Sequence, residues 1–319
     1  MPQKLIIDAD PGIGDAVAIA LAILDPEIEL LAVTATAGCV SGRQASRNVL
    51  ALIDHLDPSK RPRIGVCDDQ LATAELTIGG ADIRWERING QKGLGDWEPQ
   101  VAELHNARDS AKLLVELVKE YPNEITLLTL GPLTNVELAA EKSRDFLDGL
   151  SEIICLGGNV EGGGDVTAAA EFNVYMNPLA ARTILRSRVT KTLVPLDVCR
   201  KVTVTVSQYE RVMHGLSGPV RDLFEKLLPY LFRASHEVFG VEGLILHEVV
   251  ALAAATRPAL FGRTSMAIDV ETSGELTRGM TVFDRRGQRQ WQANIDVLRT
   301  VEGQGVLDYV MRVLQTRTA

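Results

Sequence analysis

The stretch IIDADPGIGDAVAIALAIL, residues 6–24, joins an apolar strand to an apolar helix through a short acidic turn. Residues 4–9 are predicted to form a buried strand, and residues 15–24 the helix that follows it. Asp8, Asp10 and Asp15 stand at this junction, with Pro11–Gly12 as the turn. A strand, a turn and a helix in this order begin a βαβ unit.

The same alternation continues to about residue 197. Its strands are apolar throughout, as expected when both faces of a parallel sheet are covered. We therefore predict an α/β fold, an open and mostly parallel Rossmann-like sheet with helices on both faces. The further strands are predicted at 28–36, 61–68, 124–131, 151–158 and 190–197, and the helices at 41–56, 109–122, 135–143 and 177–187.

The remainder of the chain has a different pattern. Residues 207–256 are mostly of helical period, whereas residues 266–286 alternate like an antiparallel hairpin at a sheet edge. No repeat or linker interrupts the sequence, so we predict one domain over residues 1–319.

Composition excludes several classes of protein. The net charge of −9 argues against nucleic acid as a partner, because phosphate binding needs clustered Lys and Arg. The four cysteines show no CxxC spacing, so a zinc ribbon is not expected. No apolar run approaches the roughly 20 residues of a membrane span, and no signal-peptide pattern is visible. We expect a cytoplasmic protein that binds a small molecule.

The acidic turn lies where ligands bind in open α/β sheets, beyond the carboxyl ends of the strands. One aspartate at a helix start would be an ordinary cap. Three within eight residues cannot all be caps, and neighbouring carboxylates raise each other's pKa unless a positive charge lies between them. A hard divalent cation with oxygen ligands, Ca²⁺ or Mg²⁺, is the usual solution, and we predict one here.

Three other segments are expected at the same edge of the sheet. TLGPLTN, residues 129–135, offers backbone carbonyls, and the glycine-rich loop 157–173 ends in Glu171 and Asn173, which suit sugar hydroxyls. This loop lacks the motifs of a phosphate or dinucleotide loop. His247 and Glu248 stand at the head of an apolar helix, where the pair could be a cap or part of the site.

These motifs together resemble the inosine–uridine-type nucleoside N-ribohydrolases. DADPGIGDAVAIALA is similar to the N-terminal signature of that family, D-x-D-P-G-x-D-D-A. GPLTN, GGN…AEFNVYMNP, VPLDV, the HE helix and TRGMTV follow in the family's order, from about residue 4 to 300. The resemblance implies a calcium-dependent hydrolase that cuts the N-glycosidic bond of a ribonucleoside to free base and ribose. It also implies a homodimer or homotetramer.

The resemblance assigns roles by position. Asp10 matches the cation ligand that also acts as general base on the attacking water, and Asp15 a ligand that also touches the ribose. The other implied cation ligands are the backbone carbonyl of Leu130 and the side chain of Glu248. The implied ribose contacts are Glu171 and Asn173, and the implied proton donor to the leaving base is His247.

Five positions depart from the family pattern. Gly14 stands where the family has an aspartate that holds a ribose hydroxyl, and Glu248 replaces the usual Asp. Cys39 and Asp165 replace sugar-side asparagines, and Asn89 stands where a histidine is common; all three are expected near the substrate. If Gly14 limits the reaction, Gly14→Asp should raise activity.

Two alternatives remain open from the sequence. The departures also suit a noncatalytic or substrate-divergent homologue that keeps the fold and the cation. A phosphotransferase using Mg²⁺ is compatible with D-x-D, but no phosphate cradle or suitably placed lysine supports it. Base preference is expected to depend on residues near 75–90 and on 207–245.

Overall fold

The central sheet of the computed structural model has nine strands in the order β4-β3-β2-β1-β5-β6-β7-β11-β8. The structure describes residues 1–67, 85–101, 107–288 and 290–315. Every ladder of this nine-stranded sheet is parallel except that between β11 and β8, so the predicted α/β fold is confirmed. The strands are β1 (Gln3–Ala9), β2 (Ile28–Ala35), β3 (Arg63–Val66), β4 (Arg108–Asp109), β5 (Ile125–Thr129), β6 (Glu152–Leu156), β7 (Lys191–Val194), β8 (Phe261–Met266) and β11 (Ile295–Val301).

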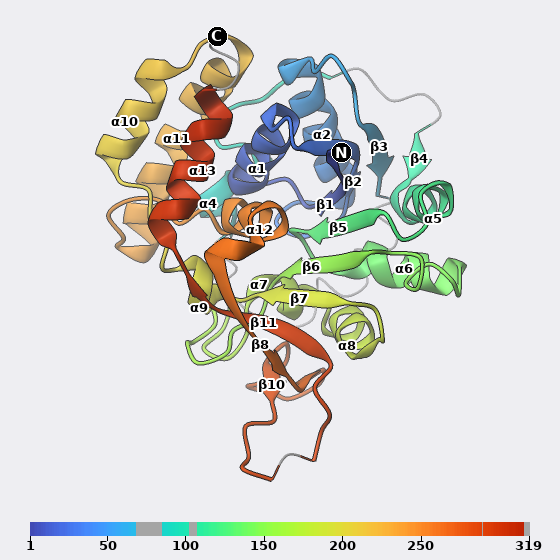
Figure 1. Ribbon diagram of the computed structural model, residues 1–319. Coiled ribbons are helices and arrows are strands. Elements are labelled where there is room, and N and C mark those ends of the chain that lie inside the picture. The colour runs from blue at the N-terminus through green and yellow to red at the C-terminus, as the bar shows by residue number, and fades with distance from the viewer. Residues whose placement is uncertain (68–84, 102–106, 289, 316–319) are drawn as a thin grey trace.

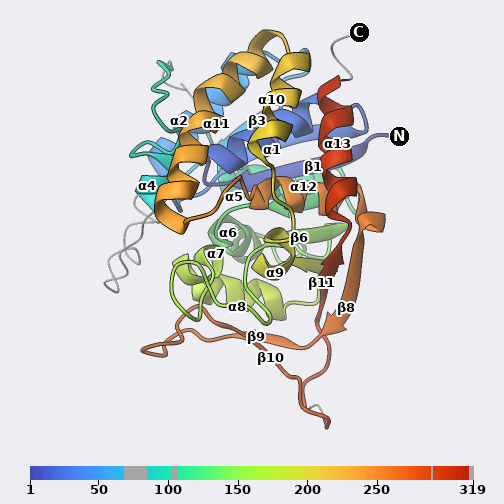
Figure 2. The ribbon, with the colours of Figure 1, turned by 90° about the vertical axis from the view of Figure 1, so that its left-hand side faces the viewer.

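Helices cover both faces of this sheet (Figure 1). One apolar core joins it to α1 (Ile13–Leu24), α2 (Gly42–Leu56), α11 (Gly218–Phe239), α12 (His247–Thr256) and α13 (Gly303–Gln315). A second core joins the opposite face to α5 (Ser110–Glu120), α6 (Thr134–Lys142) and α8 (Pro178–Arg186). The shorter helices are α4 (Trp85–Asn89), α7 (Phe172–Met176) and α9 (Leu196–Cys199), and α10 (Val206–Gly215) lies beside α11 and α13 (Figure 2).

Strand β1 shows why its sequence is apolar throughout. Leu5 and Ile7 belong to the core under α1, whereas Ile6 belongs to the core under α5. Successive side chains of a strand point to opposite faces, so a strand covered on both sides needs apolar residues at every position.

The position of β1 in the sheet places the acidic turn in a crevice. The chain proceeds from β1 through β2 to β3 on one side, and from β5 through β6 to β7 on the other. Connections therefore leave β1 and β5 in opposite directions, which opens a crevice at the carboxyl ends of these two strands. Asp10 follows β1 directly, and Leu130 follows β5.

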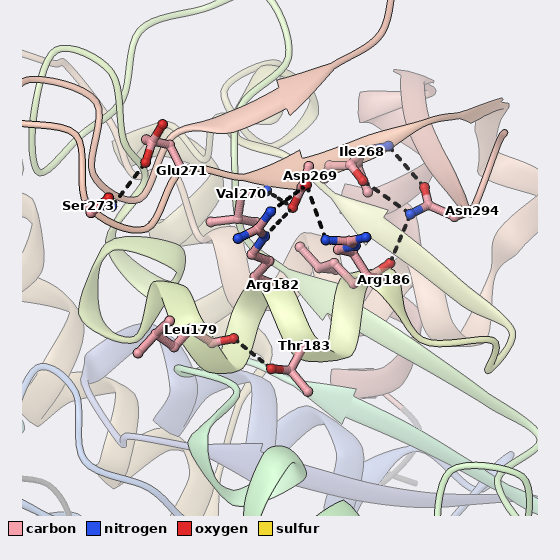
Figure 3. Close-up of polar contacts among 11 residues, drawn as sticks. Leu179, Arg182, Thr183, Arg186, Ile268, Asp269, Val270, Glu271, Ser273 and Asn294 are labelled. Atoms are coloured by element: carbon pink, nitrogen blue, oxygen red, sulfur yellow. Dashed lines mark hydrogen bonds and ion pairs between the residues drawn. The ribbon is translucent and has the colours of Figure 1, made fainter. Parts of the chain in front are cut away.

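The predicted edge hairpin differs in detail from the structure. The antiparallel edge strand of the main sheet is β8, and it pairs with β11, which our sequence analysis did not identify. β9 (Ile268–Val270) and β10 (Thr281–Phe283) instead form a separate two-stranded sheet. This small sheet lies beyond α8 and is joined to it by Arg182, which donates two hydrogen bonds to Asp269 (Figure 3).

Within the described ranges, no helix has the length and apolar character needed to cross a membrane.

Candidate active site

All but Asp8 and Gly14 of the residues that the sequence analysis proposed for the site line one pocket at the carboxyl ends of β1 and β5. The pocket is small, about 40 Å³, and five carboxylates surround it together with one imidazole. The predicted residues that line it are Asp10, Asp15, Cys39, Asn89, Leu130, Asp165, Glu171, Asn173, His247 and Glu248.

Asp10 is buried and closely enclosed by backbone. Its Oδ2 accepts a hydrogen bond from the backbone N–H of Cys39 at 2.6 Å, and the Cys39 thiol donates to the carbonyl oxygen of Asp10 at 2.8 Å. A Cβ added at Gly38 would lie 2.0 Å from Asp10 Oδ2, and one at Gly131 would lie 2.5 Å from Oδ1. Both glycines are therefore required beside this carboxylate. Burial, together with the charge of Asp15, raises the pKa of Asp10 well above its ordinary value.

Asp15 uses only one of its two oxygens within the protein. Oδ2 accepts from the backbone N–H of Gly12 at 2.9 Å, so this oxygen does cap α1. Oδ1 is buried and has no hydrogen-bond partner among the residues that the structure describes. Burial raises the pKa of Asp15 as well. Asn89 also serves α1, because its Oδ1 accepts from the backbone N–H of Ile13 at 3.0 Å.

Asp8 does not line the pocket, although it belongs to the same acidic turn. Its Oδ1 accepts from the Thr34 hydroxyl at 2.5 Å and from Nδ2 of Asn135 at 2.8 Å. Its Oδ2 is buried without a hydrogen-bond partner in the described part of the chain, and burial raises the pKa of Asp8 to about 7. Asp8 therefore links β1 to β2 and to the first turn of α6.

Glu171 and Asn173 are fixed by the backbone around them. Glu171 caps α7 and accepts from the backbone N–H groups of Gly158, Asn173 and Val174. Asn173 Nδ2 donates to the carbonyl of Leu130 at 2.8 Å and to that of Leu156 at 3.1 Å. The carbonyl that the sequence predicted as a cation ligand thus already accepts one hydrogen bond, and it keeps a second lone pair.

One turn of α9 holds the glycine-rich loop, a role that the sequence analysis missed. Asp197 accepts from the backbone N–H groups of residues 160–162 at 2.7–2.9 Å. Arg200 donates to the carbonyls of Gly163 and Gly164. The VPLDV motif contained the signal for this role. Its aspartate lies just after β7, and the glycine-rich loop follows the neighbouring strand β6, so the two were to be expected close together.

Asp165, His247 and Glu248 complete the pocket. Asp165 Oδ1 accepts from the backbone N–H of Phe172 at 2.9 Å, and burial raises the pKa of Asp165. Burial also raises the pKa of Glu248, and the charge of Asp15 adds to this effect. Burial lowers the pKa of His247 to about 4, with a further contribution from Arg200, so the imidazole is neutral near pH 7.

A larger cavity of about 310 Å³ adjoins the acidic pocket. The two share Trp85, Asn89, Asp165, His247 and Glu248. The additional apolar wall consists of Ile88, Leu231, Phe239, Val241, Ile245 and Leu246. Both segments expected to set base preference contribute to this wall, although residues 75–84 of the first lie outside the described residues.

The residues of the pocket fit a hard cation in their chemistry. Asp10, Asp15 and Glu248 offer carboxylate oxygens, and no described residue forms a hydrogen bond with the buried Oδ1 of Asp15. Oxygen donors of this kind are those that Ca²⁺ and Mg²⁺ prefer. Among the residues that the structure describes, however, no group of three or more His, Cys, Asp or Glu side chains is arranged as a metal site. The four predicted ligands share a pocket, and their coordination stays a prediction.

Comparisons with known proteins agree with the fold. A family model described as inosine-uridine preferring nucleoside hydrolase matches residues 5–308, so the protein is a hydrolase that acts on N-glycosyl compounds. The chain belongs to that family, which confirms the resemblance found in its motifs.

Individual relatives match almost the whole chain. Uridine nucleosidase 1 of Arabidopsis thaliana is 33% identical over 318 residues, which cover 97% of this chain and 92% of that protein. The pyrimidine-specific ribonucleoside hydrolase RihA of Salmonella paratyphi C is 31% identical, with 99% of each chain covered. Among solved structures, the plant nucleoside hydrolase PpNRh1 has a TM-score of 0.89 at 27% identity, covering 99% of this chain and 100% of its own. The purine-preferring ribonucleoside hydrolase from Gardnerella vaginalis also has a TM-score of 0.89, at 26% identity, covering 99% of each chain.

Proposed function

We propose that this enzyme is a Ca²⁺-dependent nucleoside hydrolase that cleaves the N-glycosidic bond of a ribonucleoside to free base and ribose. One observation carries the proposal: Asp10, Asp15 and Glu248 line a single pocket that opens beside a cavity with aromatic and aliphatic walls. A sugar fits the acidic part in its chemistry, and a planar base fits the apolar part.

The acidic lining suits the charge that develops in this reaction. Glycoside cleavage passes through a transition state in which the sugar resembles an oxocarbenium ion. Carboxylates fixed around the sugar stabilise that positive charge because they need no reorganisation during the reaction. Glu171 is held by three backbone N–H groups, so it is well placed to act as a fixed carboxylate.

Asp10 is the proposed general base, and it takes a proton from the attacking water. Its carboxylate suits this role because it lines the pocket and is held in place by the backbone N–H of Cys39. Asp10, Asp15, Glu248 and the carbonyl of Leu130 would hold the cation, and Asn173 orients that carbonyl. When bound, Ca²⁺ supplies charge that lowers the pKa of the attacking water and keeps the surrounding carboxylates ionised.

His247 is the proposed proton donor to the leaving base. It lines both the acidic pocket and the apolar cavity, so it stands at the boundary where the sugar and the base would join. With a pKa of about 4 in the substrate-free protein, the neutral imidazole donates a hydrogen bond to the base, and transfer of a proton requires that bound substrate raise this pKa. Cys39, Asn89 and Asp165 are proposed substrate contacts on the sugar side.

The test measures release of free ribose from a panel of purine and pyrimidine ribonucleosides, with uridine first because two relatives carry uridine and pyrimidine in their names. Each assay is run with added Ca²⁺ and with a chelator, and Asp10→Asn is the matched variant of nearly equal size. We expect cation-dependent release that falls about 10²- to 10⁴-fold in Asp10→Asn, the usual contribution of a general base. Equal turnover in Asp10→Asn would refute the mechanism. A calcium-induced rise in Tm without any release would favour the noncatalytic or substrate-divergent homologue.

A further inference from the structure

Gly14 occupies a position in α1 where the backbone does not require glycine. It lies in the first turn of the helix and its φ is outside the left-handed region that favours glycine. Glycine is also one of the poorest helix formers. The reason for a glycine here must therefore lie in the space around it.

That space is filled by the carboxylate of Glu248, which reaches across from the first turn of α12. A Cβ added at Gly14 would lie 2.0 Å from Oε2 of Glu248, 2.4 Å from Cδ and 2.7 Å from Oε1. All three atoms at the end of the glutamate side chain would collide with it. A residue larger than glycine at position 14 and this placement of Glu248 exclude each other.

The same placement brings Glu248 to the boundary of the two cavities. Glu248 lines both the acidic pocket and the apolar cavity, whereas Gly14 lines only the apolar cavity. Asp15, the residue after Gly14, lines the same acidic pocket as Glu248, so the two carboxylates face one pocket. The longer glutamate side chain thus puts a carboxylate next to Asp15, beside a residue that has no side chain.

We propose that Gly14 is a positioning residue and that Gly14 and Glu248 form a compensating pair. Gly14 leaves room for the Glu248 carboxylate to enter the site beside Asp15, and Glu248 supplies from α12 a carboxylate that α1 lacks at position 14. This proposal rests on the proposed function, in which Glu248 binds the cation. It also replaces the expectation that Gly14→Asp alone raises activity, because that side chain would collide with Glu248 and repel it.

The first test is a double-mutant cycle in Tm, measured in chelator and without substrate. Gly14→Ala should lower Tm in the native background. In the Glu248→Asp background it should raise Tm by about 1–3 °C, because the shorter side chain withdraws the carboxylate and alanine has a higher helix propensity than glycine. In Glu248→Gln, which keeps the volume but not the charge, Gly14→Ala should again lower Tm. Gly215→Ala is the matched control, since Gly215 ends α10 with nothing within 4 Å of its added Cβ, and it should not lower Tm. Additive effects of Gly14→Ala and Glu248→Asp would overturn the pairing.

The second test measures the dissociation constant of Ca²⁺ by calorimetry on the same variants. Gly14→Ala should weaken Ca²⁺ binding about 10- to 100-fold, the usual effect of disturbing a residue that supports a ligand. Gly14→Ala/Glu248→Asp should recover most of that loss. Unchanged Ca²⁺ affinity in Gly14→Ala would overturn the positioning role. If the native protein releases no ribose or binds no calcium, that result would count against the proposed function alone. The Tm cycle involves neither nucleoside nor cation, so it would still test the pairing of Gly14 with Glu248.

Discussion

Removing the charge of Asp8 should change how the stability of this protein depends on pH. The folded protein raises the pKa of Asp8 from 3.8 to about 7, because the carboxylate is buried. The folded state therefore binds this proton more tightly than the unfolded state does. The stability that Asp8 contributes is complete below about pH 4 and is lost as the pH rises from about 4 to about 7.

The size of the effect follows from the pKa difference. A shift of about three units corresponds to about 4 kcal/mol, at about 1.4 kcal/mol for each unit. Asp8→Asn keeps the shape and the oxygen that accepts from Thr34 and Asn135, but it has no proton to titrate. Between pH 4 and 7, the free energy of unfolding of the native protein should fall more steeply than that of Asp8→Asn, by about 1.4 kcal/mol per pH unit.

Urea unfolding in chelator at half-unit intervals of pH measures this difference directly. The other buried carboxylates titrate in both proteins, so their contribution cancels in the comparison. Asp197→Asn is the control, because hydrogen bonds from the backbone lower the pKa of Asp197. Its loss should therefore change the pH dependence of the free energy of unfolding only below about pH 4. Parallel curves for the native protein and Asp8→Asn between pH 5 and 7 would refute the reasoning.

Two further predictions concern the segments that surround the site. Thr281→Val should lower the free energy of unfolding by about 2–4 kcal/mol and raise KM. The Thr281 hydroxyl accepts a hydrogen bond from the backbone N–H of Asn159 and donates one to its carbonyl, and valine leaves both backbone groups unpaired. An unchanged urea midpoint would contradict this. Arg182→Met should lower Tm slightly, with a difference that shrinks at high salt, because its pair with Asp269 is partly exposed. Ribose release should not change in Arg182→Met, and a loss of activity there would show that the small sheet controls the site.

The sequence predicted the sheet well because its signals are local. Each apolar strand between helices can be recognised from its own residues, and parallel connections leave few alternatives for their order. Strand β11 was missed because its position depends on distant partners: it pairs with β7 on one side and β8 on the other. Nothing within IDVLRTV indicates that it belongs between them.

The site was predictable for a related reason, since the carboxyl ends of parallel strands meet at one edge. That Asp10, Leu130 and Glu171 line one pocket could be predicted without knowing their contacts. The opposite orientation of Asp8 was not foreseen. It lies inside β1 on the same face as Ile6, so its carboxylate points away from the pocket and toward Asn135.

The collision between a side chain at position 14 and Glu248 could not be found from the sequence. The two positions are far apart in the chain, and each substitution looks unfavourable by itself. Only the packing of α12 against α1 shows that one substitution makes room for the other.

The placement of β11 and α13 has a consequence for the order in which the protein forms during synthesis. Strands β1, β2 and β5 are all made within the first 129 residues, but β8 gains its partner only when residues 295–301 have been translated. Helix α13 packs on α1, where the Tyr309 hydroxyl donates to the buried Asp25 carboxylate at 3.0 Å. A nascent chain lacking these segments would therefore leave the flank of α1 uncovered while it is still attached to the ribosome. Chaperones that bind exposed apolar helices should meet this protein after the residues of the acidic pocket have been made and before residues 295–315 are available.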